Sequence, residues 1–361
     1  MNYKKALEKI EPYKPGLSEN EIMEKYNLTK VVKLASNENP YGQSDHIKEL
    51  FKDLNKIERY PDNYCKKLRE KLAFKYTITN ENLIFGNGSV EIIQMITRAL
   101  IQADDEIITC SPTFQSYYLE TFIEQGKVID IPLTDSYKFD LNGIVSKISD
   151  KTKIIYIANP NNPTGTIITS SELSDFMHKI PNNILVVLDE AYAEFVNDKD
   201  YPDSIKLLRE FSNICILRTF SKAYGLAGLR VGYGISNPRF INELEKVRLP
   251  FNVSSIAQEA ALIALEDTRF LNDCIENSRK VIENVYKRLD SYNIEYIKTE
   301  ANFIMIDTKQ DCKIIAEKLL KNGFIVRPGF PNMNTFIRVT IGTESEMNDF
   351  VECLNSIIKE K

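Results

Sequence analysis

Short apolar runs alternate with stretches of helical spacing between about residues 82 and 250. In residues 90–101 the apolar positions recur every three or four residues, as on the buried face of a helix. Seven other segments are almost continuously apolar, which is typical of strands covered on both faces. They are residues 83–85, 106–110, 127–132, 153–158, 184–188, 214–219 and 229–235. The alternation predicts an α/β fold with a mostly parallel, doubly wound, seven-stranded sheet.

The pattern changes after Pro250. Long amphipathic helices are expected up to about residue 290, followed by three short strands and a closing helix. The strands are residues 302–306, 324–327 and 335–341, and the helix is 344–359. The first 45 residues are rich in proline and glycine and should pack on this second unit. We therefore expect an N-terminal arm (1–45) that is part of a small α+β domain, a large domain (46–250) and a small C-terminal domain (251–361).

Composition and charge exclude several functions. The 361 residues carry a net charge of −5 without a long basic run, so no nucleic-acid surface is expected. The chain has no apolar stretch long enough to span a membrane and no apolar signal segment, so we expect a cytoplasmic protein. The 2 histidines and 6 scattered cysteines predict neither a metal site nor a Ser-His-Asp triad. Catalysis must use lysine, carboxylate, tyrosine or a cofactor.

Four motifs follow predicted strands, which is where open α/β sheets bind ligands. The first is GNGS at 86–89, whose backbone N–H groups and following helix can cradle a phosphate. The structural alternative is a tight turn with Ser89 as helix N-cap. The second is NPNNPTG at 159–165, whose prolines and glycine either present an asparagine amide to a ligand or form a rigid turn.

The third and fourth motifs carry charged groups. Asp189, in DEAY, is a carboxylate at the tip of a buried strand, which is costly unless it is paired with a group such as a pyridinium N–H; a helix cap is the alternative. Lys222 lies beside Ser221, and Arg230 follows eight residues later. A lysine can form a Schiff base with an aldehyde, and hydroxyls with an arginine can hold a phosphate. A solvated lysine would explain this segment taken alone, but the four motifs together indicate pyridoxal phosphate.

These residues resemble the fold-type I pyridoxal-phosphate aminotransferases, and most closely the histidinol-phosphate aminotransferases. The resemblance rests on the four motifs and on three further segments, NENPYG at 37–42, RYPD at 59–62 and FIRVTIGT at 336–343. It covers essentially the whole chain. One departure is Val90, which stands after the serine of the glycine-rich turn where many relatives carry an acidic residue. A cradle made of backbone N–H groups tolerates this change.

The resemblance implies a role for each matching residue. Lys222 is expected to bind the cofactor as a Schiff base and then to move the substrate's α-proton. The remaining cofactor contacts are Asp189 to the pyridine nitrogen, Asn162 and Tyr192 to the ring hydroxyl, Phe114 to the ring face, and Gly88, Ser89, Thr219, Ser221 and Arg230 to the phosphate. The implied substrate contacts are Arg338 to a carboxylate, Arg327 and Tyr13 near a distal phosphate, and Tyr60 reaching the neighbouring subunit's site. A homodimer with composite sites is thereby implied. A solvated strand arginine is the alternative for Arg338, and a strand end with a turn for Arg327.

The implied activity converts L-histidinol phosphate and 2-oxoglutarate into imidazole-acetol phosphate and L-glutamate, a step of histidine biosynthesis. Both substrates are small anions, which a cationic pocket can serve. Two alternatives share the scaffold, namely an aromatic amino-acid aminotransferase and a threonine-phosphate decarboxylase. A non-catalytic regulator module that binds the cofactor is a remote third. The residues alone leave the substrate preference open.

Overall fold

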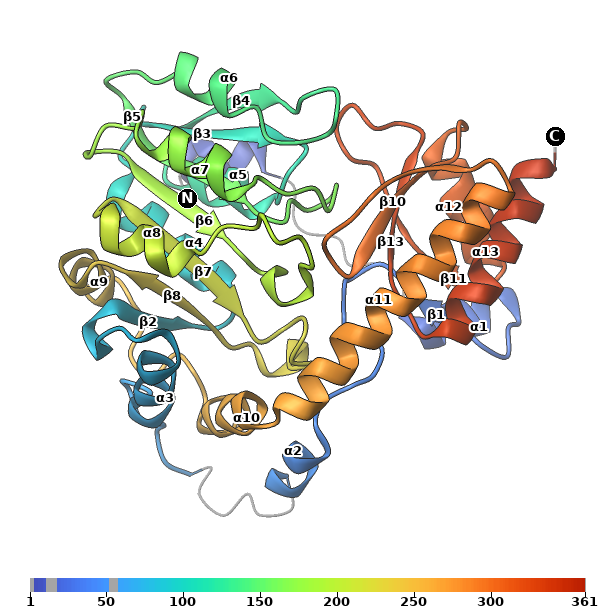
Figure 1. The fold of residues 1–361 in the computed structure, drawn as a ribbon, viewed down its shortest axis with the longest axis horizontal. Coiled ribbons are helices and arrows are strands. Elements are labelled where there is room, and N and C mark those ends of the chain that lie inside the picture. The colour runs from blue at the N-terminus through green and yellow to red at the C-terminus, as the bar shows by residue number, and fades with distance from the viewer. Residues whose placement is uncertain (1–2, 11–17, 52–57, 361) are drawn as a thin grey trace.

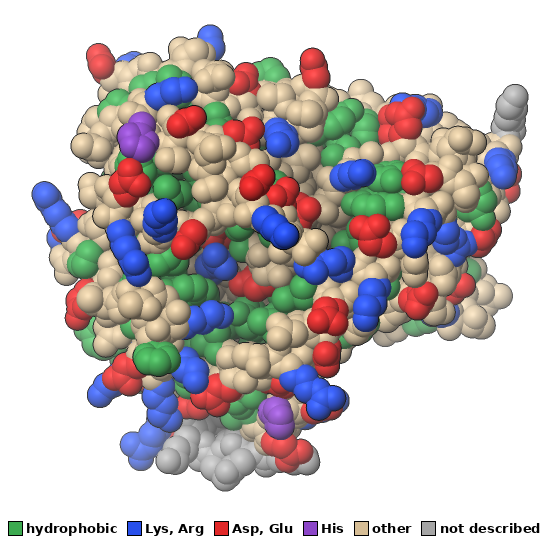
Figure 2. Space-filling model, viewed as in Figure 1, with side chains coloured by type: hydrophobic (Ala, Val, Ile, Leu, Met, Phe, Trp, Pro, Cys, Tyr) green, Lys and Arg blue, Asp and Glu red, His purple; other side chains and the backbone are tan. Residues whose placement is uncertain are grey.

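The computed structural model describes residues 3–10, 18–51 and 58–360. They form two units, a larger one around a seven-stranded sheet and a smaller one around a four-stranded sheet (Figure 1). Helix α11 (Thr268–Ser291) runs from the edge of the larger unit into the smaller one. On the face drawn in Figure 2, charged side chains of both signs are interspersed. None of the described helices combines the length and the apolar character needed to cross a lipid bilayer.

The larger sheet has the strand order β2-β8-β7-β6-β5-β3-β4. Its strands are β2 (Leu83–Gly86), β3 (Glu106–Ser111), β4 (Lys127–Pro132), β5 (Thr152–Ala158), β6 (Leu185–Asp189), β7 (Ile214–Thr219) and β8 (Gly232–Ser236). Strand β8 is antiparallel to both of its neighbours, and the other neighbouring pairs are parallel. The predicted mostly parallel, seven-stranded sheet is confirmed.

Both faces of this sheet are buried, which explains the apolar runs. In β5, Ile155 and Ile157 enter one buried cluster, whereas Ile154 and Tyr156 enter the other, because successive side chains alternate between faces. Helices cover both faces (Figure 1). They are α2 (Asp45–Leu50), α3 (Lys66–Tyr76), α4 (Ser89–Leu100), α5 (Ser116–Ile123), α6 (Leu141–Ser146), α7 (Ser170–Met177), α8 (Ser204–Glu210), α9 (Pro238–Glu245) and α10 (Ser255–Glu266).

The smaller unit is built on an antiparallel sheet of order β12-β13-β10-β9. Its strands are β9 (Glu295–Ile297), β10 (Phe303–Asp307), β12 (Arg327–Pro328) and β13 (Phe336–Thr340). Helices α11, α12 (Cys312–Lys321) and α13 (Glu344–Lys359) bury their apolar faces against it. Strand β1 (Val32–Lys33) pairs with β11 (Phe324–Ile325), which ties the segment after α1 (Glu19–Tyr26) to this unit.

Two predicted strands differ from the structure. The strand expected at 229–235 begins only at Gly232, because residues 227–229 form the 3-10 turn η4 (Ala227–Leu229) and Arg230 has a φ of 55°. The strand expected at 324–327 is split into β11 and β12, which pair with different partners. Strands β1 and β9 were not predicted, since two or three residues are too few to display an alternating pattern.

Packing also bears on the domain limits. Helix α10 lies in the same buried cluster as one face of the large sheet and contacts α2 and α3. The 3-10 helix η1 (Lys5–Lys9) contacts α5, and Lys4 Nζ donates a hydrogen bond of 3.3 Å to the carbonyl of Ile123. We therefore propose that the large domain extends to the start of α11 instead of ending at 250, and that the first residues of the arm pack on it.

Candidate active site

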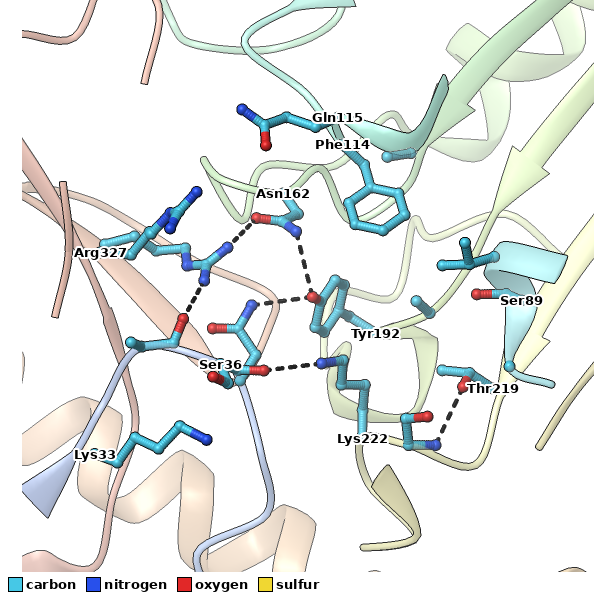
Figure 3. Close-up of a pocket in the computed structure, with 18 of the residues that line it drawn as sticks. Lys33, Ser36, Ser89, Phe114, Gln115, Asn162, Tyr192, Thr219, Lys222 and Arg327 are labelled. Carbon is cyan, nitrogen blue, oxygen red and sulfur yellow. Dashed lines mark hydrogen bonds between the residues drawn. The ribbon is translucent and has the colours of Figure 1, made fainter. Parts of the chain in front are cut away.

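A cavity of about 860 Å³ opens between the two units, at the carboxyl ends of the parallel strands (Figure 3). Loops after β3, β5, β6 and β7 form one wall, while β12, β13 and residues 33–37 form the other. The cavity gathers every predicted cofactor residue together with both predicted arginines of the small domain. They are Gly88, Ser89, Phe114, Asn162, Asp189, Tyr192, Thr219, Ser221, Lys222, Arg230, Arg327 and Arg338.

Lys222 presents its amine to this cavity. Its Nζ donates a hydrogen bond of 3.0 Å to the carbonyl of Ser36 and lies 5.7 Å from the centre of the Tyr192 ring (Figure 3). Burial, and secondly the positive charge of Arg338, lower the pKa of Lys222 to about 8. Because an uncharged amine is the nucleophile, this lysine is suited to attack an aldehyde near neutral pH.

Asp189 is the last residue of β6 and is buried. Its Oδ2 accepts a hydrogen bond of 2.8 Å from the hydroxyl of Tyr117, and its Oδ1 accepts one of 3.1 Å from the N–H of Ala191. Burial raises the pKa of this carboxyl, while the two hydrogen bonds and the charge of Lys222 oppose that rise. A cationic ring N–H placed in the cavity would compensate the buried negative charge.

The start of α4 forms an anion cradle with Arg230. Gly88, the N-cap of α4, has a φ of 78°, and a Cβ on it would lie 2.5 Å from Nη2 of Arg230. Within the described residues, Arg230 donates hydrogen bonds of 3.2 to 3.3 Å to neutral oxygens of Ser221, Ala227 and Asn87. A helix N-terminus, two nearby hydroxyls and a guanidinium without an acidic partner suit a phosphate dianion.

Arg338, on β13, is buried on the opposite wall. It donates hydrogen bonds of 2.6 Å to Asn162 Oδ1 and 2.5 Å to the carbonyl of Ala35, while its Nε has no hydrogen-bond partner in the described structure. Burial lowers the pKa of Arg338 to about 10, and the charge of Arg327, its register partner on β12, adds to this effect. A buried guanidinium whose hydrogen-bond partners in the described structure are neutral is suited to bind an anion.

Aromatic groups complete the cavity. Phe114 lines it and packs edge-on against Tyr117, with ring centres 5.6 Å apart. The hydroxyl of Tyr192 accepts a hydrogen bond of 3.0 Å from Asn37 and a longer one of 3.5 Å from Asn162 (Figure 3). Burial raises the pKa of Tyr192, so its hydroxyl keeps its proton and can donate it to a ligand oxygen.

One predicted substrate residue, Tyr60, does not line the cavity. The side chain of Tyr60 is 82% exposed and stacks on Phe251, with ring centres 4.7 Å apart. Tyr13 lies outside the described residues.

Two cavity residues were not predicted from the sequence. They are Asn37, within the NENPYG segment, and Tyr117, three residues after Phe114. The three-residue spacing from Phe114 could have indicated that Tyr117 faces the same side. The contact of Asn37 with Tyr192 spans 155 positions of sequence, so no local pattern could have indicated it.

The donor set fits pyridoxal phosphate. The amine of Lys222 can take an aldehyde, Asp189 a ring N–H, and the Gly88 cradle, which a Cβ would fill, a phosphate. In the described part of the chain, no group of three or more His, Cys, Asp or Glu side chains is arranged to hold a metal ion.

Comparison with known proteins leads to the same chemistry. Residues 29–354 match the family described as aminotransferase class I and II. The histidinol-phosphate aminotransferase of Geobacillus sp. (strain WCH70) is 42% identical, with 100% of this chain and 99% of that protein covered. That of Caldicellulosiruptor saccharolyticus is also 42% identical, over 99% of this chain and 100% of the relative.

A solved structure shows the same fold. The histidinol-phosphate aminotransferase of Sinorhizobium meliloti, in complex with pyridoxal-5'-phosphate, superimposes with a TM-score of 0.91 at 24% identity. The match covers 99% of this chain and 97% of that one. The predicted fold and the resemblance read from the motifs are thus confirmed. The chain belongs to the class I and II aminotransferases and, within them, to the family of the histidinol-phosphate aminotransferases.

Proposed function

We propose that the protein transfers the amino group of L-histidinol phosphate to 2-oxoglutarate, giving imidazole-acetol phosphate and L-glutamate in histidine biosynthesis. The observation that carries this proposal is Arg338, a buried cation whose hydrogen-bond partners among the described residues are neutral, in the same cavity as Lys222. A carboxylate of 2-oxoglutarate supplies the missing anion and can accept two parallel hydrogen bonds from the guanidinium. The full-length relatives named for this reaction support the choice of substrates.

The cofactor is pyridoxal phosphate. When bound, it supplies an aldehyde for the substrate's amine and a protonated ring that stabilises negative charge at the α-carbon. Asp189 would hold the ring nitrogen, and the Gly88 cradle with Arg230 would hold the phosphate. Tyr192 and Asn162 would bind the ring hydroxyl oxygen, and Phe114 would cover one ring face.

Lys222 has the central chemical role in this proposal. With its pKa lowered to about 8, about a tenth of the amine is uncharged at pH 7, far more than for an ordinary lysine. When it is not bonded to the cofactor, Nζ would accept the proton of the substrate's α-carbon and, as its conjugate acid, would donate a proton back in a later step. Asp189, held by Tyr117, keeps a negative charge facing the ring during this transfer.

Two unlike anions must use one cavity in turn. Arg327 and Arg338 are opposite each other on neighbouring antiparallel strands, so a single wall carries two cations. In one half-reaction this wall would face the phosphate of histidinol phosphate. In the other it would face the carboxylates of 2-oxoglutarate, with Arg338 as the buried contact.

We further propose a cytoplasmic homodimer in which Tyr60 completes the site of the neighbouring subunit. The stacked rings of Tyr60 and Phe251 lie at the surface, and Tyr64 and Leu249 nearby are 61% exposed each. An exposed apolar patch of this kind favours a protein interface. The family membership of the chain supports the same assembly.

The test is an absorption titration of the cofactor-loaded protein without keto acid. L-histidinol phosphate, L-glutamate, L-phenylalanine and O-phosphothreonine are added in separate cuvettes, and conversion of the cofactor to its amine form is followed. Efficient conversion by histidinol phosphate and glutamate, and only slow conversion by phenylalanine, is the expected result. Preference for phenylalanine would instead indicate an aromatic aminotransferase, and release of CO2 from phosphothreonine a decarboxylase.

A further inference from the structure

The connection between β9 and β10 contacts both units of the protein. Its residues 299–302 are called the 299–302 turn below. The N–H of Glu300 donates a hydrogen bond of 2.8 Å to the carbonyl of Gly165 in the larger unit. Asn302 donates one of 3.2 Å to the carbonyl of Asn37. The turn therefore touches two segments that line the active-site cavity.

The carboxylate of Glu300 fixes a third segment. Its Oε2 accepts hydrogen bonds of 2.7 Å from the N–H of Asn197 and 3.3 Å from the N–H of Asp198. These residues follow η3 (Ala193–Phe195), the 3-10 turn that comes directly after Tyr192. Hydrogen bonds from backbone N–H groups to a carboxylate are stronger than those between neutral groups, and here they cross the boundary between the units.

Each of the three segments carries one side chain that lines the cavity. Asn162 precedes Gly165 by three residues, Tyr192 precedes Asn197 by five, and Asn37 itself carries the third. Asn37 and Asn162 both donate to the hydroxyl of Tyr192, and Asn162 accepts the hydrogen bond of Arg338.

Packing at the turn leaves little freedom. A Cβ on Gly165 would lie 2.0 Å from Oγ1 of Thr299, so the 159–165 loop lies directly against the turn. Ala301 and Phe303 form a buried cluster with Tyr192, whose ring lies edge-on to that of Phe303 at 5.0 Å. A shift of the turn would therefore displace Tyr192 and Asn162 together.

We propose that Glu300 is a positioning residue for carboxylate substrates. It does not line the cavity and acts through the 159–165 and 197–198 segments on the pair formed by Asn162 and Arg338. The inference rests on the proposed function, because it assumes that Arg338 binds the carboxylate of the keto acid. Histidinol phosphate has no carboxylate, so its half-reaction depends less on this alignment.

The experiment compares Glu300→Ala and Glu300→Gln with Glu283→Gln. Glu283 is an exposed acid on α11 that lines the same surface hollow as Glu300, so its substitution removes a nearby charge without touching the turn's hydrogen bonds. Each protein is loaded with cofactor. The KM and kcat of the half-reactions with L-glutamate and L-histidinol phosphate are measured separately. Calorimetry gives the Kd of glutarate, a non-reacting dicarboxylate, and thermal unfolding gives Tm.

For Glu300→Ala we expect the KM for glutamate and the Kd for glutarate to rise about tenfold, since small misplacements of a binding group are costly. The KM for histidinol phosphate should rise less than about threefold. Glu300→Gln keeps an acceptor oxygen and should fall between this variant and the wild type, and Glu283→Gln should match the wild type.

Equal rises in the KM for glutamate and the KM for histidinol phosphate, together with a lower Tm, would show that Glu300 merely stabilises the fold. This result would overturn the inference. Unchanged glutarate binding in Glu300→Ala would overturn it as well. If Glu300→Ala does not fold, the isosteric Glu300→Gln is used instead, and its change in KM for glutamate is compared with its change in KM for histidinol phosphate. A wild type that reacts with glutamate but not with histidinol phosphate would refute the proposed substrate while leaving the glutarate test of Glu300 intact.

Discussion

The hydroxyl of Tyr117 donates a hydrogen bond of 2.8 Å to Oδ2 of Asp189, although the two residues are 72 positions apart in the sequence. The ring of Tyr117 is buried and stacks on Tyr156, with centres 4.5 Å apart and planes within 5° of parallel. The stacking on Tyr156 thus holds the Tyr117 hydroxyl in place, and that hydroxyl holds the carboxylate of Asp189, which faces the cavity. Tyr117 therefore helps to keep Asp189 ionised in a buried position.

Replacing Tyr117 by phenylalanine should weaken cofactor binding while preserving the ring packing. Without the hydroxyl, the pKa of Asp189, which burial already raises, rises further and the carboxyl loses negative charge. We expect the Kd of pyridoxal phosphate to increase about tenfold, the size of a lost hydrogen bond to a charged group. Equilibrium dialysis measures this Kd. The matched control is Tyr118→Phe, which removes a surface hydrogen bond to Asp130; equal Kd values for the two variants would contradict the assigned role of Tyr117.

Cofactor uptake by the apo protein should depend on pH through Lys222. Burial lowers its pKa to about 8, so the reactive uncharged amine accumulates as pH rises through that value. The uptake rate should therefore increase from about pH 7 and level off above about pH 9, whereas an ordinary lysine would keep accelerating toward about pH 10.4. Stopped-flow absorbance follows the reaction. A rate that still rises severalfold between about pH 9 and about pH 10 would exclude the lowered pKa.

Arg338→Gln should abolish protection of the protein by dicarboxylates. In the wild type, glutarate is expected to raise Tm because a ligand that binds only the folded state stabilises it by mass action. The variant lacks the guanidinium that provides the buried cationic contact. We expect its KM for 2-oxoglutarate to rise about a hundredfold, the usual order for losing a charged, bidentate contact. Steady-state kinetics and thermal scans with glutarate check both results, and an unchanged Tm shift would place the carboxylate elsewhere.

Gly88→Ala should damage the phosphate cradle more than backbone strain alone can explain. A new Cβ would lie 2.5 Å from Nη2 of Arg230, in addition to the cost of a φ of 78°. Gly42→Ala is the matched control, since Gly42 has the same φ of 78° but no atom within 4 Å of the added Cβ. Both variants should lose about 1 kcal/mol of stability from strain. Only Gly88→Ala should also release pyridoxal phosphate during gel filtration, and the same release from the control would remove the steric explanation.

Mixing two inactive variants should restore activity if Tyr60 acts in the neighbouring site. Tyr60→Ala lacks the tyrosine, and Lys222→Ala lacks the amine. A mixed dimer contains one site with both residues intact, so random reassociation should recover about a quarter of wild-type activity. The mixture is denatured, refolded together and assayed, with each variant refolded alone as the control. No recovery, with dimers present in sedimentation analysis, would show that Tyr60 is not shared between subunits.

Much of the fold and of the cofactor side of the site could be predicted from local patterns. The doubly buried strands of the large sheet display continuous apolar runs, and in a parallel sheet their carboxyl ends meet at one edge. For that reason motifs as far apart in the chain as GNGS at 86–89 and the Lys222 segment were expected around one ligand, and both line one cavity. The roles of the individual residues stay predictions until the experiments above are done.

Other features follow only from tertiary contacts. Strands β1 and β9 have two and three residues, too short to show a period, and exist because their partners supply the hydrogen bonds. Helix α10 looks like the start of the second domain, yet its small apolar residues pack on the first.

By itself the sequence determined the succession of the longer strands and helices along the chain and the chemical groups at the strand ends, because these depend on residues close together in the chain. The tertiary structure decided which distant groups meet. Arg338 reaches Asn162 across 176 positions, and the carboxylate of Glu300 meets the N–H of Asn197 across 103. Such contacts depend on strand register and on how the two units pack, and both result from the burial of the whole chain.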